Sequence, residues 1–175
     1  MVKKIAITGP ESTGKSILTK KLAEHFQTVY VPEFARVYID SLSRPYNQDD
    51  ILHVAEYQLI NERKAIVNAN RFLFCDTELI VTKIWSLHKY NDCHPWILEQ
   101  IEKNRYDLFL LCDVDLPWEY DVQREHPHLR KYFFDWYKNE LEIYGFPYKV
   151  VSGQGIQRIQ NATDLINDFF STGND

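Results

Sequence analysis

Short apolar runs alternate along the chain with longer segments in which hydrophobic residues recur at helical spacing. Five runs rich in β-branched and aromatic residues predict strands, at residues 4–8, 28–31, 71–75, 107–112 and 148–151. The segments with helical spacing predict helices at residues 14–26, 33–42, 49–70, 78–89, 94–104, 129–144 and 161–170. Strands that alternate with helices form a parallel sheet covered on both faces. We therefore predict one α/β domain of three layers, α/β/α, over residues 1–175, with a frayed tail at 171–175.

A phosphate-binding loop is predicted between the first strand and the first helix. Residues 9–16 read GPESTGKS, which matches the Walker A pattern in the strand–loop–helix context that the pattern requires. Backbone N–H groups of such a loop surround a phosphate, and the following helix adds the positive end of its dipole. Lys15 is expected on the β- and γ-phosphates of ATP, and the Ser16 hydroxyl on Mg²⁺. The predicted nucleotide-binding residues are Gly9, Glu11, Ser12, Thr13, Gly14, Lys15, Ser16, Thr19 and Arg158.

Carboxylates follow the second and third predicted strands. Asp76 comes directly after the third strand, where it could hold Mg²⁺ or accept a proton from an acceptor hydroxyl. The alternative for Asp76 is a helix cap, since Asp76 and Thr77 precede a predicted helix. Glu33 and Arg36 lie three residues apart at a helix start and are expected to bind the acceptor. A surface ion pair between these two residues is the alternative.

The fourth strand leads into a polar, proline-containing segment that we interpret as a lid over the nucleotide, at about residues 115–131. Arg124, Arg130 and Lys131 could stabilise charge on the phosphoryl group, and Trp118 or Tyr120 could stack on an aromatic base. A solvated connection whose aromatic residues serve the core is the other interpretation. A loop at residues 152–157, followed by Arg158, is expected near the adenine.

Composition excludes several classes of function. The net charge of −5 gives no global footprint for nucleic acid, and no apolar run is long enough to span a membrane. Three dispersed cysteines and the absence of a signal-peptide pattern favour a reduced, cytoplasmic protein. The spacing of the histidines does not match a zinc site, so solvated histidines are expected at His94, His126 and His128.

Four motifs in order carry a resemblance to a known family. Besides the phosphate-binding loop, these are PEFAR at 32–36, CDT at 75–77 and DLPWEYDVQR at 115–124. Together they resemble the ribosylnicotinamide kinase domain of NadR-type NAD salvage proteins, over essentially the whole chain. The loop is generic to many NTPases, whereas the other three segments are more specific.

The resemblance implies a sheet of the nucleoside-monophosphate-kinase type and transfer of the ATP γ-phosphate to the 5′-hydroxyl of nicotinamide riboside, giving nicotinamide mononucleotide. By match of motif, Glu33, Asp76 and Asp121 would face the riboside or Mg²⁺, and Arg124 would serve the phosphoryl group. Val122 departs from the glycine that often follows this aspartate in the family. The loop begins at residue 9, so a helix-turn-helix and an adenylyltransferase domain are not expected.

The sequence thus predicts a small-molecule kinase that uses ATP and Mg²⁺, with Lys15, Asp76, Glu33 and Arg124 as catalytic residues and Glu33, Arg36, Asp76, Trp118 and Asp121 as acceptor-binding residues. Ser16 and Asp76 are the predicted metal ligands. The alternatives are a kinase for another nucleoside or small metabolite, and a nucleotide-dependent regulatory ATPase. The many tyrosines and tryptophans fit either a homo-oligomer interface or an aromatic core.

Overall fold

The centre of the protein is a parallel sheet whose strand order places β1 between β3 and β4. The computed structural model describes residues 1–171, and its sheet has five strands in the order β2-β3-β1-β4-β5. The strands are β1 (Lys3–Thr8), β2 (Tyr30–Val31), β3 (Phe72–Asp76), β4 (Leu108–Cys112) and β5 (Tyr148–Val151). All four described pairings are parallel. The predicted five-stranded parallel sheet is therefore confirmed.

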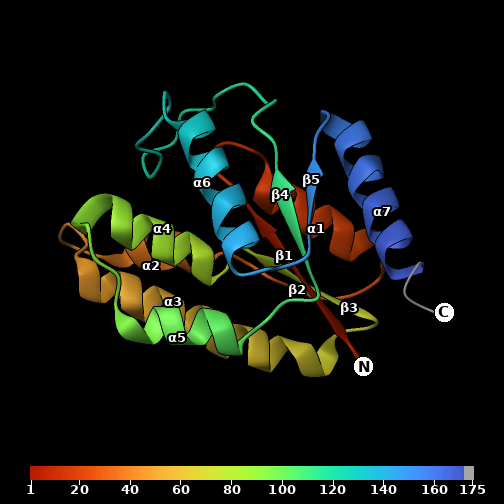
Figure 1. Ribbon diagram of the computed structural model, residues 1–175, viewed down its shortest axis with the longest axis horizontal. Coiled ribbons are helices and arrows are strands. Elements are labelled where there is room, and N and C mark those ends of the chain that lie inside the picture. Colours follow the sequence, from red (N-terminus) through yellow and green to blue (C-terminus); the bar gives the residue numbers. More distant parts are fainter. Residues whose placement is uncertain (172–175) are drawn as a thin grey trace.

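Helices cover both faces of the sheet and complete three layers (Figure 1). On one face lie α1 (Lys15–His25) and α7 (Gly155–Ser171). The opposite face is covered by α3 (Gln48–Ala65), α4 (Leu79–Tyr90), α5 (Pro95–Lys103) and α6 (Arg130–Ile143), and α2 (Phe34–Ser41) packs on α3. The chain leaves β1 toward one face and β3 toward the other. A crevice for ligands therefore opens between the carboxyl ends of these neighbouring strands.

The core consists of two hydrophobic clusters, one on each face of the sheet. Phe72 and Phe74 of β3 point to the α1–α7 face, whereas Leu73 and Cys75 point to the other face. All five residues of β3 and of β4 are buried. Strands that are covered on both faces need apolar side chains at every position, because both sets of side chains leave water. This explains the unbroken apolar runs in the sequence.

Two helices differ from the prediction at one end. The predicted helix at 49–70 ends at Ala65 as α3, and the chain continues as a 3₁₀ turn at Ile66–Asn68, a common way to close a helix. The last helix begins at Gly155 instead of residue 161, so the predicted loop at 152–157 is shorter and Arg158 lies inside α7. Ser171 ends α7, and residues 172–175 of the predicted tail lie outside the described residues.

Side chains rather than local composition alone fix two helix starts. Asn47 and Asp50 form a reciprocal capping box at the start of α3. Glu78 caps α4, because its carboxylate accepts a hydrogen bond from the backbone N–H of Ile80. The alternative prediction that Asp76 or Thr77 caps this helix is therefore wrong. Asp76 is the last residue of β3 and is free for another role.

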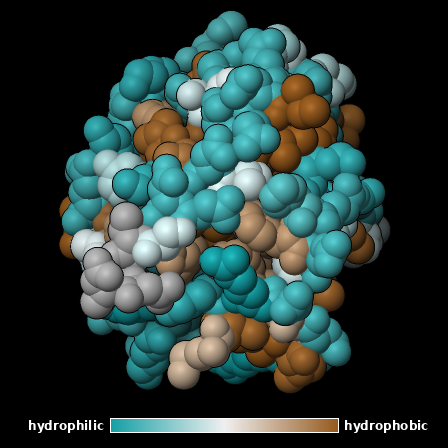
Figure 2. Space-filling view, turned by 90° about the vertical axis from the view of Figure 1, so that its right-hand side faces the viewer, coloured by the Kyte–Doolittle hydropathy of each residue, from teal (hydrophilic) through white to brown (hydrophobic). Residues whose placement is uncertain are grey.

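Polar residues cover most of the face on the right-hand side of Figure 1, and hydrophobic residues on this face are gathered in separate patches (Figure 2). This view gives no single large apolar area of the kind that stable interfaces bury. Across residues 1–171, no helix combines the length and the apolar character needed to cross a bilayer.

Burial of Glu78 predicts a pH-dependent stability. Burial raises the pKa of this carboxyl to about 7, although hydrogen bonds from Ile80 and Thr8 lower it. The folded protein therefore holds a proton on Glu78 that the unfolded chain releases near its usual value of 4.5. Consequently the free energy of unfolding should decrease as the pH rises from about 4.5 to about 7, by an amount on the order of 1–3 kcal/mol.

Urea denaturation at pH 5 and pH 8 tests this prediction. Glu78→Gln should reduce the difference in unfolding free energy between the two pH values, because glutamine does not titrate. The control is Glu102→Gln on α5, where the carboxylate is exposed, and it should keep the wild-type difference. An unchanged difference in Glu78→Gln would show that another group causes the pH dependence.

Candidate functional site

The predicted phosphate-binding loop lies at the carboxyl end of β1, between the ends of β3 and β4. Gly9 begins the loop with a φ of 125°, a conformation essentially restricted to glycine. A Cβ atom at this position would lie 3.0 Å from the carbonyl oxygen and 3.3 Å from the nitrogen of Cys112, both in the backbone of β4. The loop can therefore pass this close to β4 only because residue 9 has no side chain.

Hydrogen bonds within the loop hold its turn. The Thr13 hydroxyl and the Lys15 ammonium each donate to the carbonyl oxygen of Pro10, at 2.8 Å. Helix α1 begins at Lys15, and the exposed Ser16 lies in its first turn. The first N–H groups of α1 and the positive end of its dipole thus face the same point as Lys15 and Ser16. Thr19 is buried one turn later and donates to the carbonyl oxygen of Lys15.

A cavity of about 200 Å³, which we call the loop cavity, opens in front of the loop. Its lining includes loop residues 11–16 and three cationic side chains from three separate segments: Lys15, Arg36 and Arg124. Convergent cations and free amide groups make a binding site for several negative charges. The nucleotide phosphates are the ligand that this geometry suits.

The Arg158 side chain is buried beneath the phosphate-binding loop and hydrogen-bonds to it. Its side chain is only 4% exposed, and its guanidinium donates to the carbonyl oxygens of Thr13, Asp113 and Gly153. It also forms an ion pair with Asp115 at 2.6 Å. Arg158 was predicted in a loop near the adenine, and the structure instead places it beneath the phosphate-binding loop and outside both cavities described here.

Asp76 is buried at the end of β3, paired in register with Ile7 of β1. Burial raises the pKa of its carboxyl, while the Ser16 hydroxyl and the Lys15 ammonium lower it. Its Oδ1 atom has no hydrogen-bond partner within residues 1–171. The following residue, Thr77, has a φ of 68°, which a β-branched residue adopts only under strain. The fold therefore holds a buried carboxylate oxygen beside Ser16 without satisfying it.

This arrangement fits a magnesium ion. Mg²⁺ is bound in nucleotide sites through one or two protein oxygens, and the phosphates supply other ligands. Ser16 and Asp76 offer a hydroxyl and a carboxylate oxygen of this kind. In the part of the chain that the structure describes, His, Cys, Asp and Glu side chains nowhere form a group of three that would hold a metal ion without the nucleotide.

Glu33 stands directly before α2, makes no side-chain capping hydrogen bond and lines both cavities of the site. Burial raises the pKa of its carboxyl, the Lys15 ammonium opposes this effect, and the Asp76 carboxyl adds to it. Gln58 of α3 fixes this region, because its side chain accepts from the Phe34 N–H at 3.2 Å and donates to the Asp76 carbonyl oxygen at 3.4 Å. The buried amide of Gln58 thus joins the last residue of β3 to the first residue of α2.

The connection between β4 and α6, residues 113–129, crosses the phosphate-binding loop and is bound to it at several points. Ser12 accepts from the Glu119 N–H at 2.8 Å and from Arg124 at 3.4 Å. Glu11 accepts from the backbone N–H groups of Glu125 and His126. The segment predicted as a lid is therefore seen in contact with the loop.

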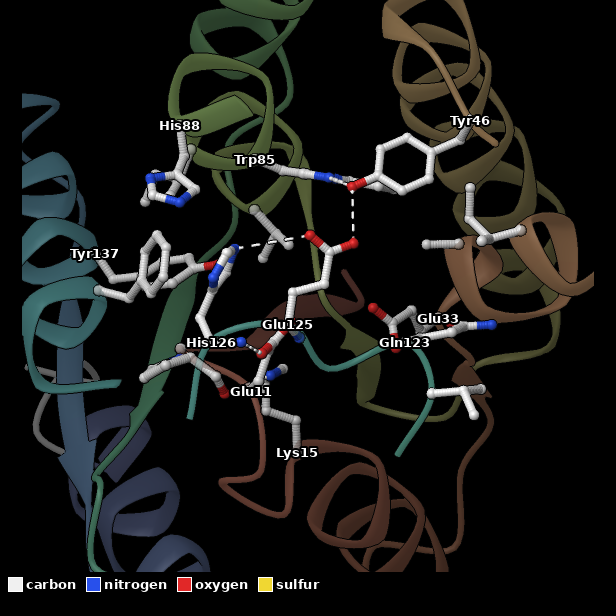
Figure 3. A pocket seen from close by; sticks show the side chains of 18 residues that line it. Glu11, Lys15, Glu33, Tyr46, Trp85, His88, Gln123, Glu125, His126 and Tyr137 are labelled. Carbon is white, nitrogen blue, oxygen red and sulfur yellow. Dashed lines mark hydrogen bonds and ion pairs between the residues drawn. The ribbon is translucent and has the colours of Figure 1, made fainter. Parts of the chain in front are cut away.

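A second cavity of about 270 Å³, the aromatic cavity, adjoins the loop cavity (Figure 3). The two cavities share Glu11, Lys15, Glu33 and Gln123. Its aromatic lining residues come from four segments: Tyr46, Trp85, His88, His126, Phe133 and Tyr137. It also has three carboxylates, Glu11, Glu33 and Glu125, and of the described residues that line it Lys15 alone is a lysine or arginine.

Several predicted acceptor residues lie outside the aromatic cavity. Asp121 pairs with Arg36 at 2.8 Å, so the expected alternative of a pair between Glu33 and Arg36 is not the pair observed. The Gln123 N–H and the Arg36 side chain lower the pKa of Asp121. Trp118 is half-buried beside Arg130, at 5.7 Å from guanidinium to ring centre, and lines neither cavity. Tyr120 is 84% exposed.

Sequence reasoning missed the residues that form the far wall of the aromatic cavity. Tyr46 lies between two predicted helices, Trp85 falls in the helix predicted at 78–89 and Glu125 in the lid predicted at 115–131, and none of the three was predicted as a site residue. His126 was expected to be solvated, but it is half-buried and packs against His88 and Phe133, with ring centres 4.7 and 5.4 Å away. The only signal in the sequence was the position of Glu125 and His126 directly after Arg124.

Comparison with known proteins identifies the family of the chain. A family model described as AAA domain matches residues 4–158, and the chain therefore belongs to this family. The trifunctional NAD biosynthesis/regulator protein NadR of Salmonella typhimurium is 32% identical over 129 residues, which cover 70% of this chain and 31% of NadR. The resemblance to NadR-type proteins is confirmed, and the chain spans about a third of the length of that relative.

Solved structures share the fold. A NadR protein in complex with NR superposes with a TM-score of 0.79 at 22% identity, covering 96% of this chain and 50% of the other. Deoxyadenosine kinase from M. mycoides superposes with a TM-score of 0.64 at 15% identity, covering 94% and 99% of the two chains. The P-loop fold expected from the sequence is thus shared with these two proteins.

The contact between Gly9 and β4 gives a prediction about nucleotide binding. Gly9→Ala should weaken ATP affinity by about 100-fold or more, because the new methyl group forces the loop away from Cys112 and moves the amides that bind phosphate. Calorimetric titration with ATP·Mg²⁺ measures the affinity.

Gly145→Ala is the matched control: Gly145 also has a positive φ, 62°, but an added Cβ meets nothing within 4 Å. It should lower stability by about 1 kcal/mol and leave ATP affinity unchanged. Wild-type affinity in Gly9→Ala would contradict the prediction.

Proposed function

We propose that the protein is a nucleoside kinase that transfers the ATP γ-phosphate to the 5′-hydroxyl of nicotinamide riboside. The observation that carries this proposal is the pair of adjoining cavities that meet at Lys15 and Glu33. The loop cavity suits a triphosphate, and the aromatic cavity suits a flat base with its sugar directed toward Lys15. Phosphoryl transfer requires such an in-line arrangement of donor and acceptor and little further chemistry from the protein.

The charges of the aromatic cavity favour a nucleoside over a nucleotide or another anionic acceptor. A monophosphate would place its negative charges among Glu11, Glu33 and Glu125. A cation among these carboxylates and aromatic rings is stabilised by both. The pyridinium ring of nicotinamide riboside carries a positive charge. A NadR protein has also been solved with NR, which we take to be nicotinamide riboside.

The residues of the site would have separate roles in phosphoryl transfer. Lys15 and Arg124 neutralise charge on the transferred phosphoryl group, and Arg36 adds a third cation at the cavity wall. Glu33 accepts the proton of the acceptor hydroxyl, because it lines both cavities, whereas Asp76 lines neither. Ser16 and Asp76 would hold Mg²⁺, which would supply positive charge to offset that of the phosphates.

Product formation tests the activity directly. Wild-type protein with ATP·Mg²⁺ should release ADP rapidly only when nicotinamide riboside is present, and nicotinamide mononucleotide should appear in equal amount. Lys15→Ala should reduce this rate by about 1,000-fold, because a charge on the transition state is lost. A panel of other nucleosides serves as control. If a different nucleoside stimulates ADP release, that nucleoside is the acceptor and nicotinamide riboside is not. Tight ATP binding without stimulation of ADP release by any nucleoside would favour a regulatory ATPase.

The roles of the two carboxylates, Glu33 and Asp76, should be separable by kinetics. Glu33→Gln should lower kcat by about 100-fold or more, because the base is lost. Since the raised pKa of Glu33 must be passed before the base is free, wild-type kcat/KM should fall as the pH decreases through that value, above the usual range of a glutamate. Asp76→Asn should instead raise the Mg²⁺ concentration needed for half-maximal rate, by at least about 10-fold. The reverse pattern in the two variants would exchange these roles.

A further inference from the structure

Glu125 projects into the aromatic cavity from a backbone position that the phosphate-binding loop holds in place. The Glu11 carboxylate accepts the Glu125 N–H at 3.4 Å and the His126 N–H at 3.2 Å. Figure 3 shows the side chain of Glu125 extending from this point toward Tyr46 and Trp85 on the opposite wall. The anchored backbone therefore sets the direction of the side chain.

The Glu125 carboxylate is oriented by Tyr46 and His126. Tyr46 donates its hydroxyl to Oε1 at 3.3 Å, and the same hydroxyl accepts from the indole N–H of Trp85 at 2.9 Å. The His126 Nε2 atom lies 3.9 Å from Oε2. Lys89 lies over the Tyr46 ring, 3.6 Å from its centre, and no described lysine or arginine comes within 4 Å of Glu125. The Lys89 ammonium is close enough for its charge to act on Glu125, but among the described residues no lysine or arginine forms a direct ion pair with this carboxylate, which points into the cavity.

The other two carboxylates of the cavity have different surroundings. Glu11 already binds two backbone N–H groups of the β4–α6 connection. Glu33 lies at the end that both cavities share, where the charges of Lys15 and Arg36 act on it. Glu125 lies at the aromatic end and does not line the loop cavity. If the hydroxyl of the acceptor faces Glu33, its ring must lie beside Glu125, Tyr46 and Trp85.

We propose that Glu125 is a specificity-determining residue that selects a positively charged acceptor ring over a neutral ring of the same shape. The inference rests on the proposed kinase function and assigns the charge recognition to this one side chain. A cation about 4 Å from a partly solvated carboxylate is stabilised enough to give a preference of about 10- to 100-fold. The rings of Tyr46 and Trp85 add a cation–π contribution that a neutral ring does not receive.

The test compares two ribosides that differ in the charge of the ring. Nicotinamide riboside is cationic, and its dihydro form is neutral with the same ribose and carboxamide. Glu125→Gln keeps an oxygen acceptor for Tyr46 but removes the charge. It should lower kcat/KM for the cationic riboside by about 10- to 100-fold and change kcat/KM for the neutral riboside by less than about 3-fold. Glu102→Gln, which removes an exposed carboxylate on α5, should leave both values unchanged.

A binding measurement separates this inference from the kinase proposal. The probes are 1-methylnicotinamide, a cation without ribose, and neutral nicotinamide, titrated against the full chain by tryptophan fluorescence. The wild type should bind the cation at least about 10-fold more tightly, and Glu125→Gln should remove this preference.

Each outcome decides one of the two proposals. Equal loss with both ribosides in Glu125→Gln would mean that Glu125 positions the β4–α6 connection and does not read charge, which overturns the inference. Unchanged preference in that variant also overturns it. If neither riboside is phosphorylated but the cation preference exists and depends on Glu125, the kinase proposal fails and the cation-selective cavity stands.

Discussion

The geometry of the site depends on the hydrogen bonds of the buried Arg158 guanidinium. It joins four backbone or side-chain groups that belong to the phosphate-binding loop, the end of β4 and the end of β5. Removing the charge from water is costly, and here one carboxylate and three carbonyl oxygens offset that cost. Because these partners come from three segments, the guanidinium fixes their relative positions. Gly9 can then pass within van der Waals contact of β4, and the loop amides keep one arrangement.

This rigid base supports a site whose upper part is held by weaker contacts. The β4–α6 connection is bound to the loop through Ser12 and Glu11, and most of the hydrogen bonds involved lie at 3.2–3.5 Å. Glu11 and Ser12 belong to the loop that would surround the phosphates, so nucleotide binding must affect the same atoms that hold the connection. The structure thus links the nucleotide end to Glu125 and the aromatic cavity through a short, continuous set of contacts.

The sequence predicted the parts of the molecule that depend on local pattern. The buried strands and the phosphate-binding loop were found because unbroken apolar runs and the GPESTGKS motif each have one physical explanation. Asp76 was correctly placed at a strand end, but the choice between cap and ligand needed the position of Glu78, which takes the cap. The start of α7 and the role of Arg158 were missed, since Gly155 and the polar residues around it give no helical signal. Tyr46, Trp85, Gln58 and Glu125 could not be found from spacing, because only tertiary packing brings their four segments together.

The distribution of carboxylates gives the two adjoining cavities opposite electrostatic character. Near the loop, Asp76 is buried and Glu33 half-buried beside Lys15, and desolvation raises the pKa of both carboxyls, which brings proton exchange closer to neutral pH. At the aromatic end, the Glu125 side chain is 46% exposed and remains in contact with water. A triphosphate is therefore attracted to the end with three cations, while the end with Glu125 repels it. Under the proposed function, the same field would orient a nucleoside whose ring is positive, with its hydroxyl toward the phosphates. A single polar gradient along the two cavities thus excludes the wrong orientation of both ligands.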